Sequence, residues 1–259
     1  MIFSLEALIL SKEKLGEIDL LIELFTPKGK IWSVAKGAQK SRRRFVNLLE
    51  EFNLIKAHLR KTSKGKLPIL EKADLLFLPE SIRRDYKKYL MISYMGEILS
   101  KISFPELYIE YFSFIKKLFM EIEKENPPFL LKPFFELKIL KFSGWSPEFF
   151  QCVKCGYKPK KIFFLSIPEG GILCFKCKDG NSEKLDLETV DILRSLIKMP
   201  VEFESLKKLE KDLEKAIYIK EKILKISEKF LKYFLPFELN SLKFLKDFNW
   251  GMENETEGS

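Results

Sequence analysis

The sequence is poor in the residues and motifs on which most enzymes depend. It has one histidine, His58, with no serine or cysteine nucleophile beside it in the chain. The GxxxxGK[ST] loop that binds ATP phosphates is absent, and so is the GxGxxG loop of dinucleotide-binding folds. The acidic residues form no cluster typical of a two-metal nuclease. We therefore expect no catalytic residue, no small-molecule substrate and no enzymatic turnover, and we expect His58 to lie at the surface or to contact phosphate.

Long apolar segments are also missing. No apolar run approaches the ~20 residues that span a bilayer. The first residues, MIFSLEALILSKEKLGEIDL, lack the basic segment and the small-residue cleavage site of a signal peptide. We therefore expect no membrane contact and a cytoplasmic location, where cysteines are more often metal ligands than disulfide partners.

All four cysteines lie in one stretch, CVKCGYKPKKIFFLSIPEGGILCFKC, residues 152–177. They form two CxxC pairs that are separated by eighteen residues. Each pair can form a knuckle turn that directs both thiolates at one ion, and two knuckles complete a tetrahedral site. The predicted metal ligands are Cys152, Cys155, Cys174 and Cys177.

Four cysteines close the coordination shell, whereas a catalytic zinc keeps an open position. We therefore expect a structural Zn²⁺ that organises a loop without local structure of its own. Iron in a rubredoxin-like site uses similar ligands and stays an alternative. A redox CxxC is less favoured, because such motifs rarely come as a matched pair. Lysines at 154, 158, 160, 161 and 176 make this module basic, which correlates with phosphate contact without specifying it.

The net charge of +9 is concentrated in one segment. Twelve Lys or Arg residues lie between Lys28 and Lys66 against two glutamates, which leaves +10 there and about −1 for the rest of the chain. Such a concentrated surplus points to a polyanion, most often nucleic acid. The densest part is KGAQKSRRRF, residues 36–45, whose cations can neutralise phosphates and release counterions.

No arginine or asparagine pattern indicates that bases are read, so we expect little sequence preference. Trp32 and Phe45 lie near the basic segment and are candidates for stacking on unpaired bases. The residues predicted to bind DNA are Lys36, Lys40, Arg42, Arg43, Arg44, Lys56, Arg60, Lys61 and Lys64.

The first 78 residues have the alternating pattern of strands. In EIDLLIELF the apolar residues share one face and Glu23 lies on the other, and NLIKAHLR alternates in the same way. Five short strands with an irregular insert at 37–52 predict a small barrel, for which the OB-fold is the common nucleic-acid-binding example. An SH3-like barrel stays open as an alternative.

From residue 79 the apolar residues recur at helical spacing. We predict helices at 79–102, 106–124, 130–143, 187–199 and 206–234. The expected class is α+β and multidomain, with a zinc module inserted in a helical domain. The predicted domains are an OB-fold at 1–78, helical parts at 79–149 and 181–250, a zinc-binding module at 150–180, and a disordered acidic tail at 251–259.

Three stretches resemble the bacterial recombination mediator family RecO. GEIDLLIELFTPKGKIWSVAKGAQKSRRRF is similar to the family's strand–turn–strand and basic loop. FELKILKFSGWSPEFFQCVKCG is similar to its helix before the first cysteine pair, and GGILCFKC looks like its second knuckle. The resemblance runs in the same order over most of residues 1–180, whereas ELNSLKFLKDF near the C-terminus departs from the family's pattern.

This resemblance implies an OB-fold, an inserted zinc module and no turnover. It further implies binding to single- and double-stranded DNA, annealing of complementary strands, partnership with RecR, contact with single-stranded-DNA-binding protein, help in loading RecA, and association with the nucleoid. The basic loop at 36–44 matches the family's DNA-binding loop, and the four cysteines match its metal ligands. Two other hypotheses remain: an RNA-associated zinc-ribbon protein of translation or transcription, and an adaptor whose basic face binds an acidic protein.

Overall fold

The computed structural model describes residues 1–63, 66–102, 108–213, 216–235 and 237–246, so the predicted tail at 251–259 lies outside the described residues. The chain forms two compact units. The first unit contains Met1–Asn126 and Leu239–Lys246, and the second is built on Pro127–Glu238. This division does not test the predicted domain boundaries, which stay predictions. Among the described helices, none has both the length and the apolar character that crossing a membrane requires.

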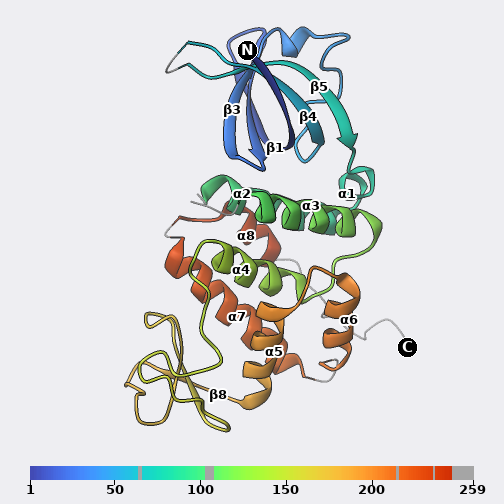
Figure 1. The fold of residues 1–259 in the computed structure, drawn as a ribbon. Coiled ribbons are helices and arrows are strands. Elements are labelled where there is room, and N and C mark those ends of the chain that lie inside the picture. The colour runs from blue at the N-terminus through green and yellow to red at the C-terminus, as the bar shows by residue number, and fades with distance from the viewer. Residues whose placement is uncertain (64–65, 103–107, 214–215, 236, 247–259) are drawn as a thin grey trace, which may run out of the picture. The chain divides into compact units, whose positions relative to one another are not determined.

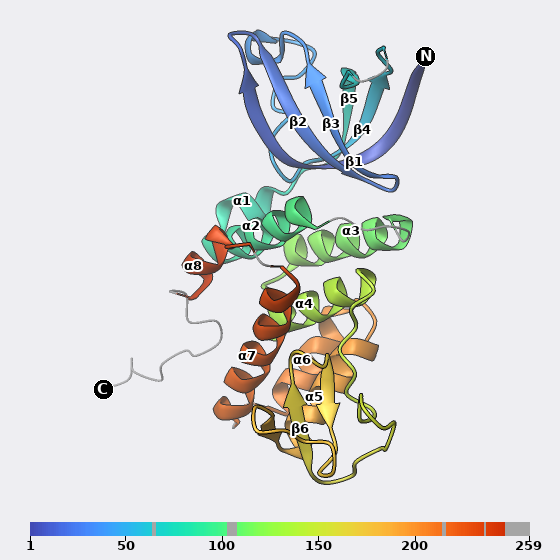
Figure 2. The same cartoon turned by 90° about the vertical axis from the view of Figure 1, so that its left-hand side faces the viewer.

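Five strands at the start of the chain close into a barrel in the order β1-β2-β3-β5-β4 (Figure 1). The strands are β1 (Ile2–Leu15), β2 (Asp19–Thr26), β3 (Gly29–Ala35), β4 (Leu54–Arg60) and β5 (Ile69–Phe77). Strand β1 is long because its first half pairs with β4 and its second half pairs with β2, which closes the barrel (Figure 2). The predicted five-stranded OB-type barrel is confirmed.

The alternating residues of the strands fill the barrel. Ile22 and Leu24 of β2 are fully buried, as are Ile55, Ala57 and Leu59 of β4. Such alternation places every second side chain inside. The predicted inward faces are confirmed for these residues, whereas Ile18, predicted on the same face as Ile22 and Leu24, lies in the turn before β2 and is 47% exposed.

The outward face of β2 is also covered, because helix α3 (Tyr108–Lys124) packs against β2 and helix α2 (Tyr86–Lys101) packs against β1. Glu23 lies on the predicted outer face but is only 4% exposed. Its carboxylate accepts a hydrogen bond of 2.7 Å from Ser100 Oγ, and Lys30 donates to the Ser100 carbonyl. Burial lowers the pKa of Lys30, and the nearby Glu23 charge partly offsets this effect.

The helices of the first unit are α1 (Glu80–Arg84), α2, α3 (Tyr108–Lys124) and α8 (Asn240–Lys246). The predicted helix at 79–102 is interrupted at Asp85, whose backbone is extended and whose side chain accepts the Lys88 N–H at 3.0 Å. A local cap of this kind starts a new helix. The predicted start at 106 of the next helix lies outside the described residues.

The carboxylate of Glu97 on α2 binds the start of helix α8. Glu97 accepts the backbone N–H groups of Asn240 and Ser241 at 3.0 and 2.9 Å. Burial acts to raise the pKa of Glu97, but hydrogen bonds from Lys101 and from the start of α8 outweigh burial and lower the pKa to about 2. The charged form of Glu97 therefore stabilises this contact.

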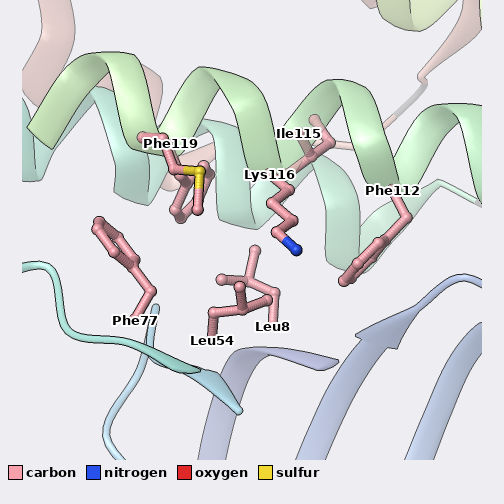
Figure 3. A pocket seen from close by; sticks show the side chains of 8 residues that line it. Leu8, Leu54, Phe77, Phe112, Ile115, Lys116 and Phe119 are labelled. Atoms are coloured by element: carbon pink, nitrogen blue, oxygen red, sulfur yellow. The ribbon is translucent and has the colours of Figure 1, made fainter. Parts of the chain in front are cut away.

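Helix α3 lies across one end of the barrel (Figure 3). Leu8, Leu54 and Phe77 face Phe112 and Phe119 of the helix around a cavity of about 10 Å³. A cavity of this size is at the lower limit for one water molecule and has no room for a ligand. We therefore interpret this pocket as part of the packed core of the first unit.

The described residues of the second unit form four helices and a small sheet. The helices are α4 (Leu131–Phe142), α5 (Leu187–Lys198), α6 (Phe203–Lys211) and α7 (Ile217–Phe234). The strands are β6 (Phe163–Ser166), β7 (Gly171–Leu173) and β8 (Glu183–Leu185), in the order β7-β6-β8. The predicted continuous helix at 206–234 is wrong, because a turn follows α6 and the backbone of Ala216 is not helical.

Helix α4 is buried on all sides along most of its length, so it forms the centre of the second unit. Its Glu136 is fully buried. The carboxylate pairs with Lys132 at 2.7 Å and accepts a hydrogen bond from Ser227 of α7. A buried charge needs such partners to offset the loss of hydration.

Candidate metal centre and nucleic-acid interface

The four predicted metal ligands come together in the second unit. The Sγ atoms of Cys152, Cys155, Cys174 and Cys177 all lie within 4.8 Å of one another, and none of the four forms a disulfide. The Cys155 and Cys174 sulfurs are 3.7 Å apart. A tetrahedral ion with bonds of ~2.3 Å to sulfur needs sulfurs ~3.8 Å apart. The arrangement fits one tetrahedral metal ion.

Each cysteine pair sits on a tight backbone turn. In the first turn Gly156 N–H donates to the Cys152 carbonyl at 2.8 Å, and Cys152 N–H donates to the Tyr157 carbonyl at 2.7 Å. Gly156 has a φ of 70°, which a side chain would strain. In the second turn the N–H groups of residues 177 and 178 donate to the Cys174 carbonyl at 3.1 and 3.0 Å. These are the two predicted knuckles.

The thiols differ in acidity. Burial acts to raise the pKa of Cys152, but backbone N–H groups of both knuckles, chiefly that of Cys174, outweigh burial and lower the pKa to about 6. Hydrogen bonds with Cys155 and Cys174 raise the pKa of Cys177 to about 12. Thiolates are the form that binds metal, so metal binding displaces protons from the cysteines. The affinity of the site for a metal ion therefore decreases as the pH is lowered.

The segment between the knuckles has its own local structure, which corrects the prediction of an unstructured loop. Strands β6 and β7 form an antiparallel pair, and Phe164 and Leu173 pack with the buried cysteines in a small core. The backbones of Gly171 and Glu148 lie so close together that a side chain at position 171 would not fit. A Cβ on Gly171 would lie 2.3 Å from the Glu148 carbonyl oxygen. Four thiolates on this small sheet can hold an ion and leave no further ligand position open.

The basic loop at 36–49 is anchored to the barrel at both ends. Gly37 N–H donates to Asp19 at 2.7 Å, and the Gln39 side chain donates to the Asp19 carbonyl at 2.7 Å. Phe45 and Leu49 insert into the barrel core, where they are 4% and 3% exposed. The loop is therefore held in place although it has little regular structure.

The three arginines of this loop are exposed. Ser41 Oγ accepts the N–H groups of Arg44 and Phe45 at 3.1 Å, which forms a turn around residues 42 and 43. The Arg44 guanidinium lies 4.6 Å from the centre of the Phe45 ring and donates to the Lys36 carbonyl. Within the described part of the chain, no carboxylate pairs with Lys36, Lys40, Arg42 or Arg43. These cations are free to meet an anion.

The predicted basic face of β4 has acidic neighbours. Arg60 Nε lies 2.5 Å from a Glu71 oxygen of β5. Lys56 is exposed and lies in register between Glu6 of β1 and Asp74 of β5. The available positive charge on this face is smaller than the sequence of the strand indicates.

His58 is the centre of a polar chain across three strands. Its Nδ1 lies 2.8 Å from Ser4 Oγ, and its Nε2 lies 2.8 Å from an Asp74 oxygen. Hydrogen bonds from Lys72 and then from His58 lower the pKa of Asp74. In a serine hydrolase the serine faces Nε2 and the aspartate faces Nδ1, the reverse of this order. We interpret the chain as a cross-strand contact that stabilises the barrel.

The remaining candidates of the basic segment differ in position. Phe45 is buried, so it does not present a ring to bases, and Trp32 is half-buried beside Glu23 in the β2–β3 pairing. Lys61 is exposed, with its Nζ 5.9 Å from the centre of the Phe3 ring. Lys64 lies outside the described residues.

Comparison with known families and proteins agrees with these features. Residues 1–78 match the family model described as recombination protein O N terminal, and residues 83–243 match recombination protein O C terminal. The DNA repair protein RecO of Thermoanaerobacter sp. (strain X514) is 26% identical over 249 residues, 93% of this chain and 96% of the relative. That of Clostridium novyi (strain NT) is 29% identical over 227 residues, 84% of this chain and 85% of the relative. The chain is therefore a member of the RecO family of DNA repair proteins.

Proposed function

We propose that this protein is a non-enzymatic mediator of recombinational repair in the cytoplasm, associated with the nucleoid. It binds single- and double-stranded DNA without strong sequence preference and anneals complementary strands. With RecR and single-stranded-DNA-binding protein as partners, it assists the loading of RecA. The observation that carries the proposal is the anchored loop that presents Arg42 and Arg43 to solvent on an OB-type barrel.

Several features support this proposal over the alternatives. The exposed cations of the loop have no carboxylate partners among the described residues, and such cations bind phosphates without reading bases. Membership in a DNA repair family favours recombination over translation, transcription or an adaptor role. The proposed DNA contacts are Lys36, Lys40, Arg42, Arg43 and Arg44 first, with Lys56, Arg60, Lys61 and Lys64 in a lesser role.

We assign the four-cysteine site a structural Zn²⁺. Zinc accepts four thiolates in a tetrahedron, and the sulfur separations fit its bond lengths. The ion holds the two knuckles against the small sheet. The thiolates of Cys152, Cys155, Cys174 and Cys177 are its ligands, and no chemical step passes through the site.

The test is the salt dependence of DNA affinity. The variant Arg42→Ala/Arg43→Ala is compared with Arg84→Ala/Lys225→Ala, which removes the same charge from exposed positions outside the barrel. Two lost phosphate contacts should reduce the slope of log affinity against log salt by ~1.4 for single strands and ~1.8 for duplex. The loss should be equal for unrelated DNA sequences.

The same titration with RNA of matched sequence, and a strand-annealing assay, separate the proposal from its alternatives. The proposal predicts that the loop variant anneals complementary strands more slowly than the control variant. The proposal would be refuted if the loop variant and the control variant had the same DNA affinity at ~150 mM salt and the same slope of log affinity against log salt. A strong preference for RNA would favour the zinc-ribbon alternative.

A further inference from the structure

The four-cysteine module carries two exposed aromatic side chains, one beside each knuckle. Tyr157 follows the first knuckle and is 60% exposed, and Phe175 lies inside the second knuckle and is 63% exposed. An exposed aromatic ring has a free face on which a flat base can stack. Neither ring is needed to hold an ion, because the ligands are the cysteines.

The backbone beneath both rings is fixed. The Tyr157 carbonyl accepts the Cys152 N–H at 2.7 Å, and Cys174, beside Phe175, accepts two hydrogen bonds through its carbonyl. The Phe175 ring also touches Phe164 of β6, with ring centres 6.4 Å apart. The rings are therefore presented by a rigid turn, so little order is lost when a flat ligand binds.

The module that carries these rings is rich in lysine. Six lysines of the module are exposed, and only Lys154 has an ionic partner, Glu169 at 3.0 Å. Lys178 Nζ lies 4.7 Å from the centre of the Phe175 ring. Among the described residues no acid pairs with the other five, which are Lys158, Lys160, Lys161, Lys176 and Lys178. Like the barrel loop, the described part of this module therefore presents a group of cations that no acid pairs with.

We infer that the module is a second nucleic-acid site, which binds unpaired bases of single-stranded DNA by stacking on Tyr157 and Phe175 while its lysines hold the phosphates. Aromatic rings framed by cations are the usual means of binding single strands without sequence preference. Duplex bases are already stacked, so this site selects single strands. The inference extends the proposed function, because a protein with separate sites on its two units can hold two strands at once.

The charge of the module favours nucleic acid over an acidic protein. An acidic protein would pair with the lysines but gains little from two exposed rings, whereas a nucleotide offers a phosphate and a flat base together. Affinity measurements on ring variants distinguish single-stranded DNA from an acidic protein as the ligand of the module.

The experiment replaces the rings but keeps their apolar bulk, as Tyr157→Leu/Phe175→Leu, with Tyr218→Leu of α7 as control because Tyr218 is 69% exposed outside the module. Metal content and far-UV circular dichroism show that the variant is folded and loaded. Affinity is measured for a thymine oligomer, for an abasic oligomer of equal length and for a duplex. Measurements are repeated in the Arg42→Ala/Arg43→Ala background, where the barrel contributes less.

For each ring lost, affinity for the thymine oligomer should fall at least about fivefold, since one stacked base is worth ~1–3 kcal/mol. Affinity for the abasic oligomer and the duplex should stay within about twofold. Tyr157→Leu/Phe175→Trp, which keeps a ring at position 175, should bind the thymine oligomer more tightly than Tyr157→Leu/Phe175→Leu. A thymine oligomer with 5-iodouracil should crosslink to the peptides around residues 157 and 175.

Three results overturn the inference: equal affinity of variant and control for the thymine oligomer, an equal loss for the abasic oligomer, or loss of binding to an acidic polypeptide such as polyglutamate with single-strand affinity unchanged. Failure of the proposed function has a different signature. If the proposed function is wrong, Arg42→Ala/Arg43→Ala has the same duplex affinity and the same salt slope as the unmodified protein. This result does not depend on the single-strand affinity of Tyr157→Leu/Phe175→Leu.

Discussion

Removal of the metal ion should loosen the cysteine module and leave the barrel intact. The knuckles are held by short backbone hydrogen bonds and by a core of four buried residues, Cys152, Phe164, Leu173 and Cys174. Two of these four, Cys152 and Cys174, are proposed ligands. The apolar part of that core is therefore two side chains, worth ~2 kcal/mol each when buried. A structural Zn²⁺ in a small module contributes ~10–16 kcal/mol at neutral pH.

The ion therefore contributes more to the stability of the module than its two apolar side chains, which together contribute ~4 kcal/mol. Loss of the ion should lower the free energy of local opening of the knuckles by at least ~4 kcal/mol, which corresponds to an acceleration of amide exchange of about a thousandfold. The affected amides are those of residues 152–157 and 174–178. Amides of β2 and β4 should keep their exchange rates, because those strands belong to the first unit.

Hydrogen–deuterium exchange before and after exhaustive chelation is the assay, with Cys155→Ser as the genetic equivalent and Ser182→Ala as a nearby control that removes no ligand. Duplex affinity should survive chelation, because we place the duplex contact on the barrel loop. The reasoning is refuted if the knuckle amides exchange at the same rate in the metal-free protein, or if chelation abolishes duplex binding while barrel exchange is unchanged.

Three further predictions concern stability. Phe45→Ala should lower the free energy of unfolding by ~3–5 kcal/mol, because the ring fills the barrel core, and thermal melting measures the loss. Glu136→Ala should cost ~1–3 kcal/mol because Ser227 and Lys132 each lose a buried partner, although Lys132 keeps Glu228 at 3.6 Å. Glu136→Gln should melt at a higher temperature than the alanine variant. The pKa of Glu97 is lowered to about 2, so its contribution is present above the ordinary value of ~4.3 and is lost as pH falls toward 2. Glu97→Ala should therefore cost ~1 kcal/mol at pH 7 and progressively less below pH 4 in denaturant titrations.

Most of the fold could be predicted because its patterns are local. The alternation of apolar and polar residues in EIDLLIELF and NLIKAHLR indicates which side chains of each strand face the barrel interior. This signal lies within the strand itself and does not depend on distant residues. The break at Asp85 was missed because the apolar stripe continues across it, and only the capping hydrogen bond to Lys88 reveals two helices. The small sheet of the module was missed because β6 and β7 are four and three residues long, too short for a period to be visible.

The cluster of four cysteines could be predicted because the spacing of the two pairs is that of two knuckle turns. The basic face of β4 was a weaker prediction, because one strand does not show its neighbours. Arg60 meets Glu71, and His58 meets Asp74, on a strand that comes later in the chain. Counting charge along a segment therefore overestimates the positive charge that a ligand meets.

Cations that have an acidic partner contribute less to phosphate binding than cations that have none. Lys30 is half-buried beside Glu23, and Arg60 is engaged by Glu71, so each would have to give up a partner to bind phosphate. An exposed ion pair is worth little by itself, but its carboxylate also repels a phosphate, which reduces the gain on DNA binding. Arg42 and Arg43 carry neither cost, because the turn around Ser41 holds them away from any acid in the described chain. Arg42→Ala should thus weaken DNA binding more than Arg60→Ala, although the two changes remove the same charge.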